Sequence, residues 1–238
     1  MQVADTARTL FEKAKQRNRH ALDEPTSKRI LGMYGMRTPR SAVVRNAAEL
    51  ESALQDIGER IALKLISPDV LHKTDFGGVA LGLKHAEEVR SAMDAMTGRC
   101  HEAGYRIDGF LLEELVQDGH EIVIGGFQDT SFGPVVMLGL GGIFIEVLKD
   151  VSFRICPITE ADALDMLNEL RGAELLRGAR GGTPVPDTIV TEALLAIGGK
   201  NGLFFQLADS ISELDINPLI VSARGAVALD ARIILASE

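Results

Sequence analysis

Cysteine and aromatic residues are scarce in this sequence. Its 238 residues include 2 Cys and no Trp, and aromatic side chains make up 5% of the total. Cys100 and Cys156 are far apart, with no second Cys or His at metal-ligand spacing, which argues against a zinc site and a disulfide framework. This use of cysteine predicts a reducing, cytoplasmic setting. The low aromatic content argues against a lectin-like or aromatic-cage surface.

Positive charge and long apolar runs are also lacking. The 25 Lys and Arg stand against 34 Asp and Glu, for a net charge of −9, so we expect no nucleic-acid partner. The longest uncharged stretch, Thr130 to Ile145, is shorter than the ~20 apolar residues of a membrane span. The N-terminus is charged and has no apolar segment of the secretory type. We therefore expect no membrane partner and no secretory signal.

The hydrophobic pattern predicts an α+β fold. Apolar residues make up 46% of the chain and charged residues 25%, which is typical of globular proteins. Apolar runs between turn residues predict strands, and apolar residues at i, i+4, i+7 after a capping residue predict helices. The predicted strands cover residues 42–45, 61–66, 79–83, 110–116, 121–127, 134–138, 143–148, 211–221 and 226–234. The predicted helices cover 1–20, 26–34, 46–58, 87–103, 159–171 and 187–197.

One internal boundary is predicted near Gly104, where a mixed helix-and-strand region gives way to a strand-rich region. The expected organisation is an N-terminal helical extension over residues 1–20, a first lobe over 21–104 and a second lobe over 105–238. The Gln117-Asp118-Gly119 turn is expected to join the strands at 110–116 and 121–127 as neighbours.

Lys64 is the only charged residue in the apolar run 61–66. Burying a lone ammonium group costs several kcal/mol unless an opposite charge accompanies it. A ligand phosphate could supply that charge, and so could an internal carboxylate. The residues alone leave both alternatives open.

The loop 67–78 follows that strand and contains His72, Asp69 and Asp75. It is about twice the usual connection length, and long loops in compact domains are often functional. A neutral imidazole attacks phosphorus near pH 7, and either aspartate could orient the ring. The alternative is a surface histidine on a solvated loop.

Carboxylates and glycines suggest a nucleotide site in the middle of the chain. Glu113 and Glu121 fall on two strands expected to be neighbours, where carboxylates could bind the hydroxyls of a ribose. The alternative is that these carboxylates are simply the solvent-facing residues of strands whose side chains alternate between core and solvent. Gly139 to Gly142 could bring backbone N–H groups close to an anion, or could form a plain hairpin turn. The Walker pattern GxxxxGK[ST] is absent.

Oxygen donors gather near the C-terminus. Asp215 and Asn217 point to the same side of a strand because side chains alternate along it. Asp230 lies on the following predicted strand and is expected to come opposite them. Carboxylate and amide oxygens are the ligands that Mg²⁺ takes together with phosphate and water. These residues therefore predict a magnesium site.

Several of these segments together resemble the ATP-grasp domain of NDP-forming acyl-CoA synthetases, the ADP-forming acetate–CoA ligases, which are related to the beta subunit of succinyl-CoA synthetase. The resemblance runs from about residue 22 to 235 and is most specific in the histidine loop and in Asp215-Ile-Asn-Pro218. The segments that carry it are 62–79, 132–142, 146–150, 170–173 and 213–221.

The resemblance implies an ATP-grasp fold in two lobes with ATP or ADP and Mg²⁺ between them. It implies the reaction acyl-CoA + ADP + phosphate ⇌ acid + CoA + ATP, in which His72 carries the phosphoryl group on a mobile loop. Lys64 matches the phosphate-binding lysine. The implied nucleotide and metal residues are Glu113, Leu115 and Val116 at the adenine hinge, Glu121 at the ribose, Gly141 and Gly142 in the glycine turn, and Asn217, Asp230 and Asp215 at the metal.

The CoA-binding and ligase domains of the family's longer members are not visible in these residues. The resemblance therefore implies a beta-type subunit that works with a CoA-binding alpha-type ligase subunit. The alternative is a non-catalytic nucleotide-binding module with a regulatory or scaffolding role. A degenerate module would be expected to have lost His72, Lys64 or the metal carboxylates, and all are present. A weaker alternative is an ATP-grasp ligase without a phosphohistidine.

Overall fold

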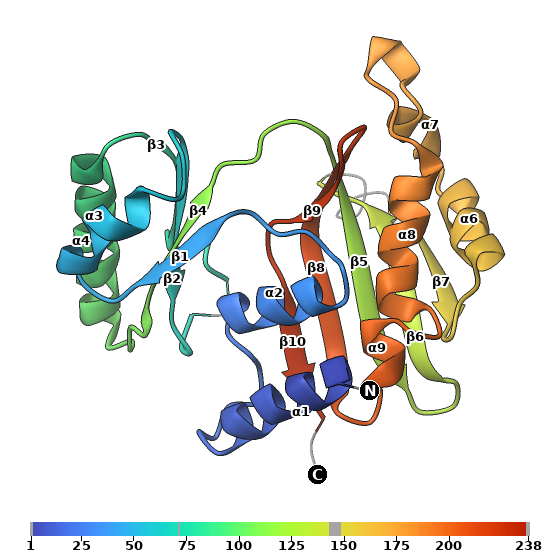
Figure 1. Ribbon diagram of the computed structural model, residues 1–238, viewed down its shortest axis with the longest axis horizontal. Helices are drawn as coiled ribbons and strands as arrows, with labels where there is room; N and C mark the ends of the chain where they lie inside the picture. Colours follow the sequence, from blue (N-terminus) through green and yellow to red (C-terminus); the bar gives the residue numbers. More distant parts are fainter. Residues whose placement is uncertain (1, 71, 143–148, 237–238) are drawn as a thin grey trace. The chain divides into compact units, whose positions relative to one another are not determined.

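The computed structural model describes residues 2–70, 72–142 and 149–236 (Figure 1). The chain forms two compact units. Unit 1 consists of residues 1–38 and 118–238, and unit 2 of residues 39–117. Both units combine helices with an antiparallel sheet, as the predicted α+β class requires.

Unit 2 is a four-stranded sheet covered on one face by helices. The strands are β1 (Ser41–Val44), β2 (Ile61–Ile66), β3 (Val79–Leu83) and β4 (Gly109–Glu114), in the order β1-β4-β2-β3. The helices are η1 (Ala47–Glu49), α3 (Leu50–Leu54) and α4 (Ala86–Ala103). Figure 1 shows α3 and α4 on the same side of the sheet. Leu63, Leu65 and Leu112 face them and form the core with Met93 and Met96.

Unit 1 is a six-stranded sheet with helices packed on it. Its strands are β5 (His120–Asp129), β6 (Gly133–Leu140), β7 (Val151–Ile155), β8 (Ile211–Ser222), β9 (Gly225–Ala228) and β10 (Arg232–Leu235). The order is β10-β8-β5-β6-β7, and β9 pairs with β8. The helices are α1 (Gln2–Lys15), α2 (Glu24–Met33), α6 (Glu160–Glu169), α7 (Ala173–Leu176), η2 (Ala179–Gly181), α8 (Asp187–Gly198) and α9 (Leu203–Gln206).

The core of unit 1 explains why the N-terminal helices belong to it. Phe11 of α1 and Ile30 of α2 are buried in the same cluster as Ile124 of β5 and Val136 of β6. Phe204 of α9 packs against the same sheet. The two N-terminal helices therefore share a core with strands more than 90 positions later in the chain. The units therefore divide the chain differently from the expected lobes 21–104 and 105–238, because β4 pairs with β1 and β2 in unit 2.

The expected pairing of the strands at 110–116 and 121–127 is wrong. β4 lies in the sheet of unit 2, whereas β5 pairs with β6 and β8 in unit 1. The connection at residues 115–119 runs from one unit to the other instead of closing a hairpin. Gly119, at φ +141°, lies against β8, where a Cβ atom would be 2.7 Å from the carbonyl oxygen of Val221. Glu113 and Glu121 are therefore not on neighbouring strands.

Other local expectations met mixed outcomes. Thr159, at the predicted start of its helix, caps α6 in a capping box, whereas α8 has Pro186 at its N-cap and Asp187 as its first residue. The strand predicted at 226–234 is split into β9 and β10. The strand predicted at 143–148 lies outside the described residues. No helix of the described part of the chain is both long and apolar enough to cross a membrane.

Candidate functional site

The predicted site residues are distributed over both units. Unit 2 contains Lys64, His72, Glu113, Leu115 and Val116. Unit 1 contains Glu121, Gly141, Gly142, Asp215, Asn217 and Asp230.

Lys64 and Glu113 form a buried ion pair. The Lys64 Nζ lies 2.9 Å from Oε2 of Glu113, with side-chain exposures of 10% and 2%. Ala62 on β2 is directly opposite Glu113 on β4, so Lys64, two residues along, is the diagonal neighbour on the same face. An internal carboxylate therefore accompanies the lysine. The sheet alternation places both on the face opposite the core residues Leu63 and Leu112.

His72 is exposed on the segment that joins β2 to β3. Its carbonyl oxygen accepts a hydrogen bond from the Phe76 N–H at 3.2 Å, which turns the chain back toward β3. The segment leaves through Gly77 at φ +72°, a conformation that favours glycine. The N–H of Gly78 donates to the carbonyl of Lys73 at 2.6 Å. The imidazole is thus carried on a short turn with a tight exit.

The Asp69 carboxylate binds Arg106, so it is not free to orient the His72 ring. The carboxylate accepts hydrogen bonds from the Arg106 backbone N–H at 2.8 Å and from Nε and Nη2 at 3.1 and 2.9 Å. These bonds lower the pKa of Asp69 to about 2. The role of Asp75 beside the ring stays a prediction.

Leu115 and Val116 lie in the connection between the units, directly after β4. Both are half-buried, and the N–H of Leu115 donates to the carbonyl of Arg60 at 2.8 Å. The segment has no regular secondary structure. Such a segment offers backbone groups to an adenine edge, which is the role the sequence predicted.

Glu121 and Gly141 are in direct contact. The N–H of Gly141 donates to the carbonyl of Glu121 at 2.8 Å. A Cβ atom on Gly141 would come within 2.6 Å of the Glu121 Cβ, so only glycine fits there. Gly142 follows at φ +60°. The glycines at the end of β6 therefore fix the backbone beside the exposed carboxylate of Glu121 at the start of β5.

Asp215 and Asp230 are close enough to influence each other. Burial, followed by the charges of Asp230 and Glu213, raises the pKa of Asp215 to about 6, against the opposing charge of Arg232. Asp230 lies in the connection between β9 and β10 and accepts a hydrogen bond from the Ala231 N–H at 2.8 Å. The expectation that Asp230 lies on a strand is therefore wrong, but its proximity to Asp215 is confirmed.

Pro218 explains why the second strand is broken. Proline has no N–H to donate to a sheet ladder. β10 pairs with residues 211–215 of β8 and β9 pairs with residues 219–222, which leaves Ile216, Asn217 and Pro218 between the two. The Leu229 N–H instead donates to the Pro218 carbonyl at 3.0 Å. This break places Asp230 beside β8.

The donor set fits a hard divalent cation by its chemistry. Carboxylate and amide oxygens suit Mg²⁺, and two nearby carboxylates repel each other until a cation accompanies them. Among the described residues, however, no group of three or more His, Cys, Asp or Glu side chains is placed to hold a metal ion. A cation here would need Asn217 and further oxygens from a ligand or water.

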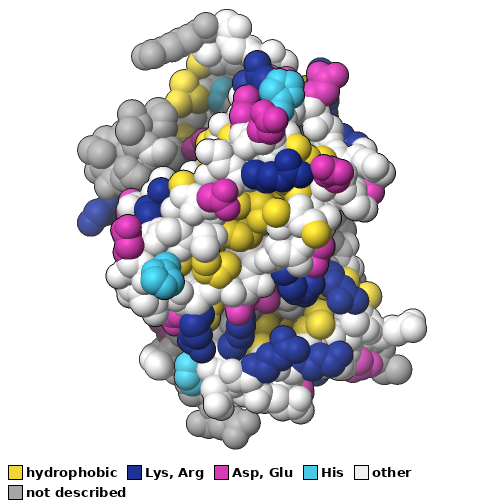
Figure 2. All heavy atoms as spheres, turned by 90° about the vertical axis from the view of Figure 1, so that its left-hand side faces the viewer, with side chains coloured by type: hydrophobic (Ala, Val, Ile, Leu, Met, Phe, Trp, Pro, Cys, Tyr) yellow, Lys and Arg dark blue, Asp and Glu magenta, His cyan; other side chains and the backbone are white. Residues whose placement is uncertain are grey.

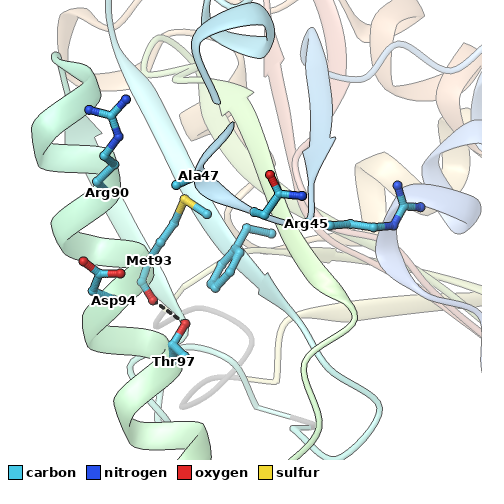
Figure 3. A pocket seen from close by; sticks show the side chains of 8 residues that line it. Arg45, Ala47, Arg90, Met93, Asp94 and Thr97 are labelled. Carbon is cyan, nitrogen blue, oxygen red and sulfur yellow. Dashed lines mark hydrogen bonds between the residues drawn. The ribbon is translucent and has the colours of Figure 1, made fainter. Parts of the chain in front are cut away.

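Two surface cavities lie away from these residues. One, of about 230 Å³, is lined in unit 2 by Arg45, Asn46, Ala47, Arg90, Met93, Asp94, Thr97 and Phe110 (Figure 3). Arg45 and Arg90 extend away from Met93 there, and Thr97 donates to the Met93 carbonyl. The other, of about 180 Å³, lies in unit 1 beside Arg37 and Glu192. Neither is lined by a predicted site residue. Basic, acidic and hydrophobic side chains all reach the face drawn in Figure 2.

Several interacting residues escaped the sequence reasoning. Arg106 and Arg99 contact the histidine segment, but nothing in their spacing distinguishes them from surface arginines. Asp150 is buried and accepts hydrogen bonds from the N–H groups of Arg171 and Gly172, at 2.8 and 2.9 Å. It is the last residue of the segment 146–150 that contributed to the resemblance. Glu146, with most of that segment, lies outside the described residues.

Residues 13–235 match the family model of an ATP-grasp domain. The beta subunit of acetate–CoA ligase [ADP-forming] I from Pyrococcus furiosus is 40% identical over 231 residues, covering 96% of this chain and 97% of that subunit. The chain belongs to the ATP-grasp family of ADP-forming acetate–CoA ligase beta subunits. A beta subunit of succinate–CoA ligase [ADP-forming] from Anaplasma marginale is more distant, at 26% identity over 87% of this chain and 54% of that subunit.

Solved structures of a relative from Ca. Korarchaeum cryptofilum share the fold of this family member. The dinucleotide-forming acetyl-coenzyme A synthetase 1 in complex with coenzyme A, Ca-AMPCP and HgCl⁺ has a TM-score of 0.90, with 36% identity, 97% of this chain and 100% of that chain covered. A second structure of it holds coenzyme A and Mg-AMPPCP, with the phosphohistidine segment pointing towards the nucleotide binding site. Its TM-score is 0.82, at the same identity and coverage.

Proposed function

We propose that this chain is the ATP-grasp beta-type subunit of an NDP-forming acyl-CoA synthetase. It binds ATP or ADP with Mg²⁺ and couples acyl-CoA + ADP + phosphate to acid + CoA + ATP. The observation that carries the proposal is the exposed His72 on the segment after β2, the strand that holds Lys64. The Ca. Korarchaeum cryptofilum relative has a phosphohistidine segment that points towards bound nucleotide, which supports this role for His72.

His72 carries the phosphoryl group. In the direction of ATP synthesis, the bond between phosphorus and the imidazole nitrogen breaks while a β-phosphate oxygen of ADP forms a new bond to phosphorus. The other ring nitrogen carries a proton, so the imidazole leaves as a neutral ring. Phosphoryl transfer depends on alignment and charge neutralisation more than on covalent machinery. Lys64 supplies positive charge for the phosphates, and Glu113 keeps that ammonium in place.

The residues that bind the nucleotide match the chemistry of its adenine, ribose and phosphate groups. Leu115 and Val116 offer backbone groups to adenine, Glu113 belongs to the same hinge, and the exposed Glu121 accepts hydrogen bonds from the ribose hydroxyls. The backbone N–H groups at Gly141 and Gly142 approach phosphate. Asp215, Asn217 and Asp230 would hold Mg²⁺, which neutralises phosphate charge when it is bound.

The partner is a CoA-binding, ligase-type alpha subunit that makes and uses the acyl phosphate, and the setting is the cytoplasm. The beta-subunit names of the relatives support the partner, and the use of cysteine supports the compartment. The alternative, a non-catalytic nucleotide-binding regulatory or scaffolding module, predicts nucleotide binding without phosphate on the protein.

The test is incubation with γ-labelled ATP and Mg²⁺, first with the chain alone and then with the alpha-type subunit. We expect label that is stable in alkali, labile in acid and absent from His72→Ala. His101→Ala is the matched control, because His101 is an exposed histidine on α4 outside the predicted site. Retained ATP binding with no label in either setting would contradict the carrier role and favour the regulatory module. The carrier role would also be contradicted if His72→Ala lost ATP binding to the same extent as it lost the label.

A further inference from the structure

The sheet of unit 1 has one face covered by helices and one face with exposed apolar side chains. Val136 of β6 points toward α8, where a Cβ atom added to Gly198 would lie 3.0 Å from the Val136 Cγ1. Arg154 of β7 points toward α6, where its Nη1 donates to Oε2 of Glu169 at 3.0 Å. Because side chains alternate along a strand, the residues next to Val136 and Arg154 point to the opposite face. The helices α6 and α8 therefore cover only one face of β6 and β7 (Figure 1).

Apolar side chains gather on that second face, over β5, β6 and β7. The register pairs Phe127 with Val135 and Val135 with Ile155, and it pairs Met137 with Phe153 in the next row. Directly paired residues have their side chains on the same face of a sheet. The rings of Phe127 and Phe153 meet edge to face across β6, with centroids 6.2 Å apart. These five residues form a connected surface, which we call the apolar platform.

The apolar platform is exposed to solvent. Phe127, Phe153 and Ile155 are 38%, 46% and 51% exposed. Since large apolar side chains have roughly 200 Å² each, these three leave on the order of 300 Å² of connected apolar surface. A contiguous patch of this size is typical of a binding surface, whereas single exposed apolar residues are not. A stable interface takes about 800 Å² from each partner, so the platform suits the apolar centre of an interface with a polar rim.

The border of the platform on β8 is acidic. Glu213 is paired with Phe127 and is exposed, and Asp215 is paired with Gly125 in the next row. A second copy of the chain fits this border poorly, because it brings the same carboxylates and a net charge of −9. The border instead suits a different protein whose apolar contact surface is flanked by Lys or Arg.

The platform also borders the proposed metal site. Asp215 on β8, Gly125 on β5, Met137 on β6 and Phe153 on β7 are paired in one continuous row. Three steps of about 4.8 Å between strands separate Asp215 from Phe153, which is about 14 Å along the sheet. A protein bound to the platform would therefore lie on the same face as Asp215 and next to it.

We propose that the apolar platform is the surface on which the alpha-type subunit docks. Phe127, Phe153 and Ile155 form the hydrophobic contact, and the exposed Glu213 meets a basic side chain at its border. This inference rests on the proposed function, in which a phosphoryl group passes between this chain and the alpha-type subunit. Docking at the platform places that subunit beside the nucleotide site, as the transfer requires.

The binding test measures the Kd between this chain and the CoA-binding subunit of the same organism by isothermal titration calorimetry. We expect Ile155→Glu to raise the Kd about tenfold or more, because its carboxylate would lose water in an apolar contact. Ile155→Ser, which adds no charge, gives a smaller increase. Leu164→Glu is the matched control, because Leu164 is also an aliphatic residue of unit 1, 40% exposed, but lies on α6. It keeps the wild-type Kd.

Amide hydrogen exchange locates the contact without any substitution. We expect the alpha-type subunit to slow exchange in wild type in the peptides that cover residues 127–135 and 151–155, and to leave α6 unchanged. Each variant alone is compared with wild type by circular dichroism and by its Kd for ATP with Mg²⁺. Both should match wild type, because Ile155 and Leu164 are not among the predicted nucleotide or metal ligands.

The outcomes separate this inference from the proposed function. If Ile155→Glu and Leu164→Glu bind the alpha-type subunit equally, or if exchange slows only outside the platform, the docking surface is wrong while the partnership stands. A dimer of wild type alone in sedimentation velocity, absent from Ile155→Glu, would assign the platform to a second copy and overturn the proposal. If wild type binds no alpha-type subunit, the proposed partnership fails, and the docking surface fails with it.

Discussion

Lys64 and Glu113 form a buried ion pair on the face of the unit 2 sheet opposite its helices, with 2.9 Å between Nζ and Oε2. The sequence had left open whether a ligand phosphate or an internal carboxylate accompanies the lysine. The ion pair answers that question for folding, because the Glu113 carboxylate accompanies the lysine within the sheet. It also orients the ammonium on β2, the strand that leads into the histidine segment.

Removing one member of this pair leaves a buried charge without its partner. We expect Lys64→Met to lower the free energy of unfolding by about 3–5 kcal/mol, and Glu113→Leu to do the same. The double variant Lys64→Met/Glu113→Leu recovers most of that loss, because no charge remains to be buried. Urea titration measures all three. Losses that simply add would contradict the pairing.

The same double variant separates folding from ligand binding. If Lys64 binds nucleotide phosphates, we expect the double variant to have a lower affinity for ATP than wild type, even though its stability has recovered. Isothermal titration with ATP and Mg²⁺ measures this affinity. Wild-type affinity in the double variant would restrict Lys64 to a structural role.

Gly141 leaves room for the backbone of β5 at Glu121. We expect Gly141→Ala to destabilise the protein by about 1–3 kcal/mol, because the new Cβ overlaps that of Glu121 at 2.6 Å. Nucleotide affinity should fall as well if Glu121 binds the ribose. Gly98→Ala is the control, because Gly98 lies in α4 with nothing within 4 Å of the added Cβ. A helical Gly→Ala change is expected to stabilise by about 0.5–1 kcal/mol. Equal effects of the two substitutions would contradict the close approach.

Asp215 and Asp230 should make thermal stability depend on Mg²⁺. We expect Mg²⁺ with a non-hydrolysable ATP analogue to raise the wild-type melting temperature by several degrees more than the analogue alone, since a ligand of the folded state stabilises it. In Asp230→Asn the extra rise is reduced or lost. Asp209→Asn is the control, because Asp209 is an exposed aspartate of the same unit, in a surface ion pair with Arg8. The same extra rise in Asp230→Asn and wild type would exclude Asp230 as a ligand.

Local pattern was enough for the elements that position the site. The strand at Ile61–Ile66, the strand at Val79–Leu83 and the helix ending at Ala103 were all predicted to within one residue, because apolar runs, turn residues and a terminal glycine mark them. Pairing was harder. The partners of β4 and β5 depend on contacts far away in the sequence, and a turn-like triplet at 117–119 suggested a hairpin that is not there.

The candidate site shows the same division. Residue chemistry nominated the Asp215 cluster, whereas the role of His72 depended on the family resemblance; the structure brings Asp230 beside Asp215. The contacts of Arg106 and Arg99 with the histidine segment could not be predicted, because an exposed arginine looks the same in sequence whether it binds a carboxylate 37 residues away or only solvent. The partner of Lys64 could not be predicted either, because it lies on another strand. Which of these residues touch nucleotide stays a prediction.

Glu169 and Arg154 provide a test of pH dependence. The Arg154 guanidinium, with the Ser152 hydroxyl, lowers the pKa of Glu169 from its usual 4.5 to about 2. Arg154 Nη1 donates to Glu169 Oε2 at 3.0 Å, and Nη2 donates to Oε1 at 2.5 Å. A carboxyl with a lowered folded-state pKa stabilises the protein above its unfolded pKa, and this contribution is lost as pH falls through the folded value.

We therefore expect wild type to exceed Glu169→Gln in free energy of unfolding by up to about 1 kcal/mol at pH 7, since the pair is partly exposed. The difference should stay constant down to about pH 5, fall to roughly half by pH 3 and vanish below pH 2. Urea titrations at several pH values measure it. Glu51→Gln, in an exposed pair with Arg90, is the control and should change stability by less than about 0.5 kcal/mol. A difference that grows as pH falls would contradict the lowered pKa, because the protonated carboxyl no longer attracts Arg154.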